Sequence, residues 1–408
     1  MNQTGSMGAL RKNNTRNKIL YIIRKNDRIS KTDIKKISRY SMSTALGTID
    51  KLVKDKILLS TYEETTRKGR PPTYISLNPD AMYFIGLAFH ATEISLVVLD
   101  FCGNATDFVS EKLQNPISAQ NVIEKVTAAL KKYLSDHAGI RHKIAGIGLG
   151  SPGFINRSSG ISLFYEHIPG WNSIDIRGIL EQEIGDIPVY IENNTNGIAL
   201  AYKWLFPEMY KMTCVIISIR SGMRMSLLVN SAVYEGDDYS SGEIGHIPVK
   251  GSKRYCPCGK RGCLEIEIAE IGLKKKIMEG IRSNSFKDIW EAADHNTNNV
   301  TTDLFLHSVK QGQDDAVQLL EEICEYLGDS ITQIVNILNP NKVIISSRYC
   351  ELESLFFDPL IRKIKATAVN MSLKSLTIEP VVFGEKSLAI GAASIVMEEE
   401  LKFVDAAI

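Results

Sequence analysis

Apolar residues in the first 77 positions recur at helical spacing in three successive segments, and two short strand-like runs follow. Helices are expected over 15–25, 31–37 and about 41–54, and strands over 57–59 and 74–77. Ser30 is a good N-terminal cap for the second helix, and Asp33 suits its first turn. Arg39 holds a turn position that is commonly Gly. Two short helices, a tight turn, a longer helix and a wing predict a winged helix-turn-helix domain over residues 1–77.

From residue 78 onward the pattern changes to apolar strands that alternate with amphipathic helices. Long helices are expected over 119–137 and 316–338. Strands are expected over 84–88, 94–99, 144–149, 189–192, 214–219 and 342–346. This alternation predicts an α/β domain over residues 78–408, with a hydrophobic core on both faces of its sheet.

The apolar pattern predicts neither a membrane-spanning helix nor a signal peptide. The apolar runs stop well short of the roughly 20 residues that a membrane span needs. Residues 1–16 are polar and lack the apolar core of a signal peptide. We therefore expect a cytoplasmic protein without a membrane partner.

Charge is distributed unevenly, although the chain as a whole carries a net charge of only +1. The first 72 residues hold 17 Lys and Arg against 6 Asp and Glu, a net charge of +11. The remainder therefore carries −10. A basic head on an acidic body is expected of a nucleic-acid-binding module joined to a separate domain. A solvated basic face is the alternative, and charge alone does not exclude it.

Candidate DNA contacts lie on the third helix and between the two wing strands. Small hydroxyl side chains allow a helix to approach a major groove closely and to bond phosphates or base edges. The third helix carries four of them on its polar face: Ser41, Ser43, Thr44 and Thr48. The segment between the strands reads Arg-Lys-Gly-Arg-Pro-Pro and places Arg67, Lys68 and Arg70 in a slim, extended cation. Such a segment suits a narrow minor groove. A basic interdomain linker is the alternative.

A compact Cys and His cluster predicts a metal site. His246, Cys256, Cys258 and Cys263 supply three thiolates and one imidazole, which form a closed tetrahedral set for zinc. Gly259 and Gly262 permit the sharp turns that such close ligands require. A closed set leaves no position for water, so we expect one structural zinc per chain. The four other cysteines are scattered and are expected in cores.

Several motifs between residues 84 and 393 carry a family resemblance. They are Gly150-Ser151-Pro152-Gly153, Pro169-Gly170-Trp171, Glu192-Asn193-Asn194-Thr195-Asn196, Gly242-Glu243-Ile244-Gly245-His246, and the Cys-x-Cys-Gly-x-x-Gly-Cys-x-Glu run from Cys256 to Glu265. They resemble the ROK family of bacterial sugar kinases and regulators. With the winged head in front, the chain resembles the regulator branch, the xylose and N-acetylglucosamine repressors. The resemblance implies an actin-like, ribonuclease H-like two-lobe ATPase-type fold.

The resemblance also implies a sugar site. The positions that would contact or line it are Gly153, Asn193, Asn194, Glu243, His246 and Glu265. His246 would direct one ring nitrogen to zinc and leave the other for sugar or for a hydrogen-bonding partner outside the ligand set. His167 stands where many family members have Asn, so sugar identity is open.

The parts that phosphoryl transfer requires are replaced. The kinases' first phosphate loop, Asp-x-Gly-Gly-Thr-Lys, reads Ala-Phe-His-Ala-Thr-Glu at 88–93, and the second loop, Gly-Thr-Gly-x-Gly, reads Arg-Ser-Gly-Met-Arg at 220–224. The late Gly-Gly is Ser346-Ser347, and Asn194 replaces the catalytic Asp. An amide is no useful base near neutral pH. We expect no catalytic residue and no ATP, and hence a pseudokinase. Arg220 and Arg224 suit a phosphorylated effector, but surface or ion-paired arginines are the favoured interpretation.

The sequence thus predicts a sugar-responsive transcriptional regulator, a repressor of carbohydrate-utilisation genes. It would bind double-stranded operator DNA and a sugar or sugar-derivative effector. A homodimer, or a tetramer, is expected because such heads read paired half-sites. Two alternatives stay open: an active ATP-dependent sugar kinase with an appended head, and a sugar-independent dimeric repressor.

Overall fold

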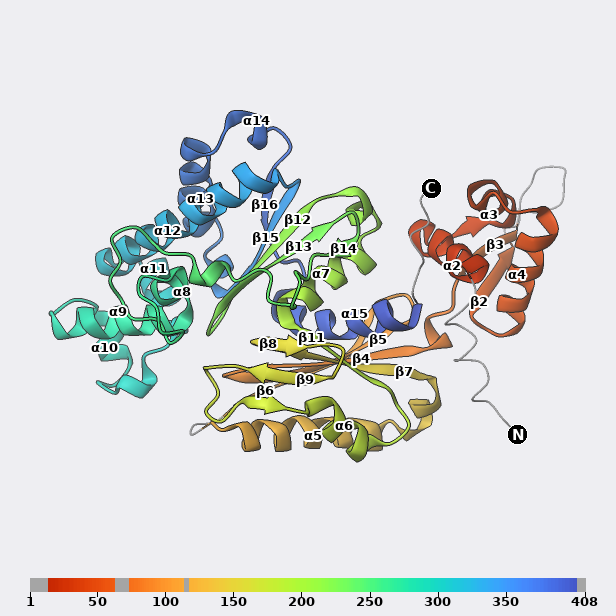
Figure 1. Ribbon diagram of the computed structural model, residues 1–408, viewed down its shortest axis with the longest axis horizontal. Coiled ribbons are helices and arrows are strands. Elements are labelled where there is room, and N and C mark those ends of the chain that lie inside the picture. Colours follow the sequence, from red (N-terminus) through yellow and green to blue (C-terminus); the bar gives the residue numbers. More distant parts are fainter. Residues whose placement is uncertain (1–13, 63–72, 114–116, 402–408) are drawn as a thin grey trace.

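A computed structural model describes residues 14–62, 73–113 and 117–401 and shows a small head beside a body of two lobes (Figure 1). The head contains residues 14–62 and 73–77, and each lobe is built around one five-stranded sheet. Within the described ranges, no helix has the length and apolar character needed to cross a membrane.

The head consists of three helices and a three-stranded antiparallel sheet. The helices are α2 (Asn14–Asn26), α3 (Lys31–Ser38) and α4 (Met42–Lys54), and the strands are β1 (Ile29–Ser30), β2 (Leu58–Tyr62) and β3 (Thr73–Leu77), in the order β1-β3-β2. The Ser30 hydroxyl accepts a bond from the Asp33 N–H at 3.0 Å, as the capping prediction requires. Arg39 ends α3 in the left-handed conformation, with φ of 59°. This order agrees with the predicted winged helix-turn-helix.

The first lobe is a mixed sheet with helices on both faces. Its order is β11-β7-β4-β5-β6, in which β4 to β6 are antiparallel and β7 and β11 run parallel to β4. The strands are β4 (Tyr83–His90), β5 (Glu93–Asp100), β6 (Ala105–Lys112), β7 (Ile144–Ser151) and β11 (Val189–Asn193). Helices α5 (Ala119–Asp136) and α6 (Ile176–Ile184) cover the face away from the second lobe (Figure 1).

The second lobe repeats the same strand order. Its sheet runs β14-β13-β12-β15-β16, again with three antiparallel strands followed by two parallel ones. The strands are β12 (Cys214–Ile219), β13 (Met223–Val229), β14 (Ala232–Val233), β15 (Lys342–Ser347) and β16 (Thr377–Pro380). Its other helices include α8 (Leu264–Ile268), α9 (Glu270–Arg282), α10 (Lys287–Ala292), α11 (Thr302–Lys310), α12 (Asp314–Leu338), α13 (Ser354–Thr367) and α14 (Asn370–Leu373). The repeated order makes the β4–β5 and β12–β13 hairpins equivalent.

Two crossing helices, α7 (Asn194–Leu205) and α15 (Ser387–Leu401), lie between the sheets (Figure 1). They cross where Gly197 faces Gly391, and a Cβ on Gly391 would lie 2.7 Å from the Gly197 carbonyl carbon. Glycine is therefore needed at this crossing. A small sheet of β8 (Phe154–Asn156), β9 (Ile161–Phe164) and β10 (Asn172–Ile174) belongs to the first lobe. The packing sets the N-terminus of α7 between the lobes.

The head is packed firmly against the body. Arg24 of α2 donates from Nε to the carbonyl of Trp204, near the C-terminus of α7, at 3.0 Å. Its guanidinium also lies over the Trp204 ring, 5.8 Å from the centroid. The rings of Tyr21 and Tyr210 are 5.1 Å apart. One cluster of buried side chains runs from Ile23 in the head to Phe101 in the body. The division of the chain after residue 77 therefore stays a prediction.

Candidate functional site

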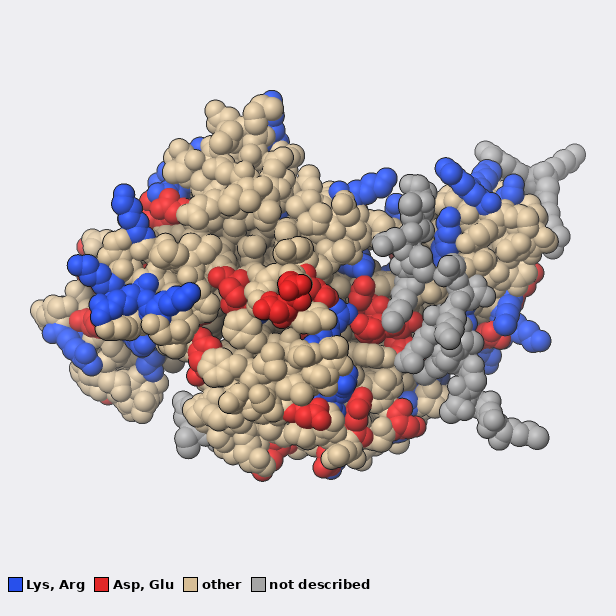
Figure 2. Space-filling model, in the orientation of Figure 1, with Lys and Arg blue, Asp and Glu red and all other residues tan. Residues whose placement is uncertain are grey.

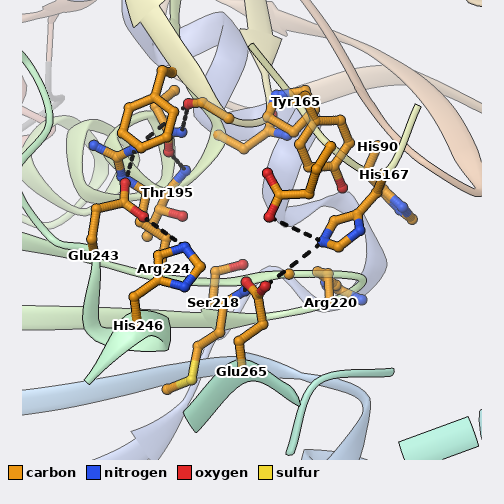
Figure 3. Close-up of a pocket in the computed structure, with 18 of the residues that line it drawn as sticks. His90, Tyr165, His167, Thr195, Ser218, Arg220, Arg224, Glu243, His246 and Glu265 are labelled. Atoms are coloured by element: carbon orange, nitrogen blue, oxygen red, sulfur yellow. Dashed lines mark hydrogen bonds and ion pairs between the residues drawn. The ribbon is translucent and has the colours of Figure 1, made fainter. Parts of the chain in front are cut away.

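A polar cavity lies between the two lobes, with about 640 Å³ of empty space including its open mouth. The end of β7, the N-terminus of α7, the β12–β13 hairpin, the short 3-10 helix η5 (Ile244–His246) and α8 contribute to its wall. Each of the six predicted sugar-site residues lines this cavity: Gly153, Asn193, Asn194, Glu243, His246 and Glu265. Their roles stay predictions, but the structure brings all six together, and Figure 3 labels Glu243, His246 and Glu265 among them.

Asn193 joins two parts of the cavity wall. Its amide nitrogen donates to the Gly153 carbonyl at 2.9 Å, and its amide oxygen accepts from the Thr195 N–H at 2.8 Å. Asn193 is thereby the N-terminal cap of α7. The bond to Gly153 fixes the loop after β7 against the start of α7.

Glu243 is held by Arg224 on one side of the cavity (Figure 3). The Arg224 guanidinium lies 2.7 Å from one Glu243 oxygen and donates to the carbonyls of Tyr239 and Ser241 at 3.1 and 2.7 Å. Burial raises the pKa of Glu243, and the charge of Arg224 opposes this rise. The other Glu243 oxygen is 3.8 Å from Nε2 of His246. Arg224 thus forms an ion pair within the protein, with Glu243 as its partner.

Glu265 and His167 face each other across the opposite side of the cavity (Figure 3). One Glu265 oxygen accepts from the Met223 N–H at 2.8 Å. Its other oxygen and Nε2 of His167 are buried, find no hydrogen-bond partner among the described residues, and lie 3.9 Å apart. Nε2 of His167 is also 3.9 Å from Glu166. Burial raises the pKa of Glu265 to about 7 and lowers that of His167. A hydroxyl that both donates and accepts suits this pair.

Glu166 and Tyr165 were not singled out in the sequence. They line the cavity beside His167, the position noted for its departure from the family pattern. The carboxylates of Glu166 and Glu265 and the ring of His167 come within 4.8 Å of one another. Their closeness depends on the approach of the two lobes, which local spacing does not reveal.

Asn194 makes a bond that a carboxylate cannot make. Its amide nitrogen donates to the Phe89 carbonyl, at the end of β4, at 2.9 Å. Its amide oxygen is buried without a partner in the described part of the chain. An Asp at this position would place an acceptor against an acceptor. The surroundings therefore suit the amide.

The two hairpins that replace phosphate loops carry side chains into the cleft. His90, the last residue of β4, lines the cavity, and burial lowers its pKa to about 3 with a smaller contribution from Arg220. Thr92 hydroxyl lies 3.1 Å from Nδ1 of His90. Arg220 and Met223 extend from the equivalent hairpin. A neutral imidazole and a thioether offer a phosphate chain little of the backbone cradle that glycine loops supply.

The four predicted metal ligands form a second, separate cluster beside the cavity. The side-chain donor atoms of His246, Cys256, Cys258 and Cys263 lie within 4.8 Å of one another. The sulfurs of Cys258 and Cys263 are 3.7 Å apart, and Nδ1 of His246 is 3.8 Å from the Cys256 sulfur. Sulfurs bound to one tetrahedral zinc are separated by nearly this distance, because each Zn–S bond is about 2.3 Å. The donor set fits zinc. Nε2 of His246 lies 3.8 Å from a Glu243 oxygen, on the side of the cavity.

The candidate DNA contacts of the head are placed in part. Ser41, Ser43 and Thr44 are exposed at the start of α4, and Thr48 is half-buried one turn later. The Ser41 hydroxyl caps the helix by accepting from the Thr44 N–H at 3.2 Å. Arg67, Lys68 and Arg70 lie outside the described residues, between β2 and β3.

Sequence comparison identifies the family of the body. The profile described as "ROK family" matches residues 84–399, which is most of the chain.

This chain belongs to the ROK family.

Relatives within the ROK family include repressors and kinases. The xylose repressor of Caldicellulosiruptor bescii is 26% identical over 390 residues, which cover 94% of this chain and 96% of the repressor. The glucokinase of Halalkalibacterium halodurans is 27% identical over 324 residues, 78% of this chain and 96% of the kinase. The repressor match therefore extends over more of this ROK chain than the kinase match.

Structural comparison confirms the predicted fold class. A ROK family transcriptional regulator, described as a homologue of the Escherichia coli MLC protein, superposes with a TM-score of 0.78 at 20% identity. The superposition covers 95% of this chain and 96% of that one. Both lobes and the head are thus parts of a fold already seen in the ROK family.

Proposed function

We propose that this ROK protein is a sugar-responsive, DNA-binding transcriptional repressor without kinase activity. The observation that carries the proposal is the match to a xylose repressor over 94% of the chain, head included. Lys and Arg side chains project from the head in Figure 2, whereas Asp and Glu gather over the middle of the body. A cationic head is suited to a polyanionic partner such as operator DNA.

The sugar would bind in the interlobe cavity. Carboxylates and amides on both lobes are the groups that recognise vicinal hydroxyls, and Glu265 and His167 still have unused bonding capacity. A ligand held by both lobes favours the conformation in which they are close. It shifts the population only if it binds the two conformations unequally.

Helix α7 provides a direct connection from the cavity to the head. Asn194 and Thr195 at its N-terminus line the cavity, and Trp204 near its C-terminus accepts the bond from Arg24. Its 12 residues span about 18 Å. A change at the cavity would therefore move the contact that supports the head, and in a homodimer it would alter the spacing of the two heads.

The absence of phosphoryl transfer is proposed from the hairpins and from Asn194. No carboxylate stands at position 194 to accept a hydroxyl proton, and side chains fill the positions of the two glycine loops. An ATP-coupled assay with hexoses, pentoses and amino sugars tests this. Clear turnover that is lost in Glu243→Ala would establish the kinase alternative.

Zinc is proposed as a structural ion bound by His246, Cys256, Cys258 and Cys263. It would order the segment that brings Glu243 and His246 to the cavity, since His246 belongs to both sites. With four protein ligands, the ion would supply stability and positioning rather than a reactive position.

The experiment that tests the proposal is a gel shift of operator DNA with purified protein and a sugar panel. At least one sugar is expected to change operator affinity. Specific DNA binding that no sugar alters would instead support the sugar-independent repressor, and loss of any specific DNA binding would overturn the proposal as a whole.

A further inference from the structure

The two arginines of the β12–β13 hairpin differ in one respect that bears on the effector. Arg224 pairs with Glu243 and donates to main-chain carbonyls, although its Nε is buried without a hydrogen-bond partner among the described residues. Arg220 also lines the cavity, yet its guanidinium forms no hydrogen bond or ion pair with any residue that the structure describes, and its Nε is buried. A guanidinium whose buried Nε has no partner bears a desolvation cost, so an anionic ligand at this place would be stabilised.

Arg220 lies where charge from both lobes converges. Burial lowers the pKa of His90 on the first lobe, and the charge of Arg220 adds to this effect. The same charge opposes the burial that raises the pKa of Glu270, the first residue of α9. Glu270 is close enough to interact with Arg220 but does not form an ion pair with it, and Arg348 shares the influence on Glu270. Arg348 itself is paired with Glu351 at 2.6 Å. Arg220 is therefore the available cation at this end of the cavity.

Other parts of the cavity wall are acidic. Glu166, Glu243 and Glu265 contribute three carboxylates to its wall, and only Glu243 has an arginine partner in the cavity. Carboxylates accept bonds from sugar hydroxyls but repel an anion. A ligand with hydroxyls at one end and negative charge at the other therefore has a defined orientation, with its charged group toward Arg220.

We propose that the effector is an anionic sugar, and that Arg220 binds its phosphate or carboxylate group. The inference rests on the proposed function, because it assigns the chemical class of the sugar. Arg220 would form a charge-assisted, two-pronged contact to the anion, which a neutral sugar cannot form. Phosphate esters and sugar acids share this chemistry, and the experiment separates them.

The test is calorimetric titration of the full-length protein with matched ligands. The ligands are glucose, xylose and N-acetylglucosamine, the terminal phosphate ester of each, glucuronate, and inorganic phosphate. For at least one sugar, the anionic form is expected to bind about tenfold to a hundredfold more tightly than the neutral form. Arg220→Met should reduce this preference to about threefold or less, whereas Arg220→Lys should keep part of it.

Two further variants make the test specific. Glu270→Gln removes the carboxylate that competes for Arg220 and should increase the preference for the anion. Arg362→Met, a matched loss of one positive charge from the exposed surface of α13 in the same lobe, should leave the preference unchanged. Equal affinity for neutral and anionic sugars, or a preference that survives Arg220→Met, would overturn the inference and leave the proposed function intact. If neither neutral nor anionic sugars bind, both fall. Binding of inorganic phosphate alone, without a gain from the sugar, would also overturn the inference.

Discussion

Position 194 shows how a single atom decides which chemistry a site can support. The amide nitrogen of Asn194 donates to the Phe89 carbonyl, so the side chain anchors the end of β4 to the start of α7. A carboxylate would fit the same space and lose this bond. Asn194 therefore has a structural role at the position where phosphoryl transfer requires a base.

Asn194→Asp tests this interpretation. The variant should lose about 1–3 kcal/mol of unfolding free energy at neutral pH, because a buried acceptor then faces the Phe89 carbonyl. It should also fail to transfer phosphate, since the phosphate loops stay replaced. Urea denaturation and an ATP-coupled assay give the two results.

A matched control for Asn194→Asp is available on the second lobe. The Asn341 side chain uses its oxygen to accept from the Thr213 N–H at 2.9 Å, and an Asp oxygen can do the same. Asn341→Asp should therefore have a much smaller effect. Equal losses in the two variants would contradict the proposed role of the Phe89 contact.

His90 predicts a dependence of stability on pH. Burial lowers its pKa from 6.5 to about 3, so the folded protein keeps the ring neutral where the unfolded chain protonates it. The unfolding free energy should therefore fall as the pH decreases below 6.5. At pH 5 this contribution amounts to about 2 kcal/mol.

His90→Gln should remove that part of the decrease. Urea denaturation between pH 7.5 and pH 5, compared with the wild type and with the same substitution at the exposed His142, measures it. A pH dependence in His90→Gln as steep as that of the wild type would show that other groups are responsible.

At the scale of elements, the segment from η5 to α8 joins the metal cluster to the cavity. Cys256 and Cys263 are buried, whereas Cys258 is exposed, so Cys258→Ser removes a ligand without disturbing the core. The variant should lose the proposed zinc and melt at a lower temperature. Sugar affinity should fall as well, because Glu243 and His246 lose their support.

Elemental analysis and thermal denaturation measure the effect of Cys258→Ser. Cys102→Ser, outside the cluster, is the control and should keep one zinc per chain. Wild-type protein that contains no zinc after purification in zinc-supplemented medium would refute the assignment of the metal.

The elements that could be predicted from the sequence are those with a clear apolar pattern in their own residues. The long helices α5 and α12 were expected almost to the residue, because their apolar stripes extend over several turns. Strand β6 was missed because it alternates weakly and lies mostly exposed at the edge of its sheet. The helical period alone would also place Met42 on the apolar face of α4, but Met42 is 48% exposed, since the first turn of α4 extends past the core.

Site residues followed the same rule. The proposed metal ligands lie within 18 positions of one another, and their closeness in space was predictable from spacing. The sugar-site residues came from family motifs. The distinction between a paired Arg224 and a free Arg220 was not predictable, because it depends on Glu243 and on carbonyls of a loop that follows β14. Tertiary contacts of this kind leave no periodic trace in the sequence.

At the scale of the whole molecule, the contact of Arg24 with the end of α7 is the place where head and body meet. Burial lowers the pKa of Arg24 to about 10, but the side chain stays charged at neutral pH and donates to main-chain carbonyls of the body. If ligand binding in the cavity displaces α7, the displacement would reach the head through the contacts of Arg24.

Arg24→Met should uncouple the two functions. Operator affinity without sugar should stay within about threefold of wild type, while the change that sugar produces should decrease severalfold, because the contact is worth about 1.5–3 kcal/mol. Gel shifts with and without the effective sugar measure both. Lys25→Met removes the same charge from an exposed neighbour on α2 and should respond to sugar normally. A normal response in Arg24→Met would exclude this route.

The shared core also restricts how such regulators can be recombined. The side chains that support α2 come from segments far apart in the body, including Phe101, Trp204 and Tyr210. A chimera that takes its head from one regulator and its body from another would bring together two surfaces that were never selected to fit. A change of operator preference should therefore be sought at the proposed DNA contacts, which are the exposed face of α4 and Arg67, Lys68 and Arg70, with α2 and the body surface that it packs against kept from the same parent.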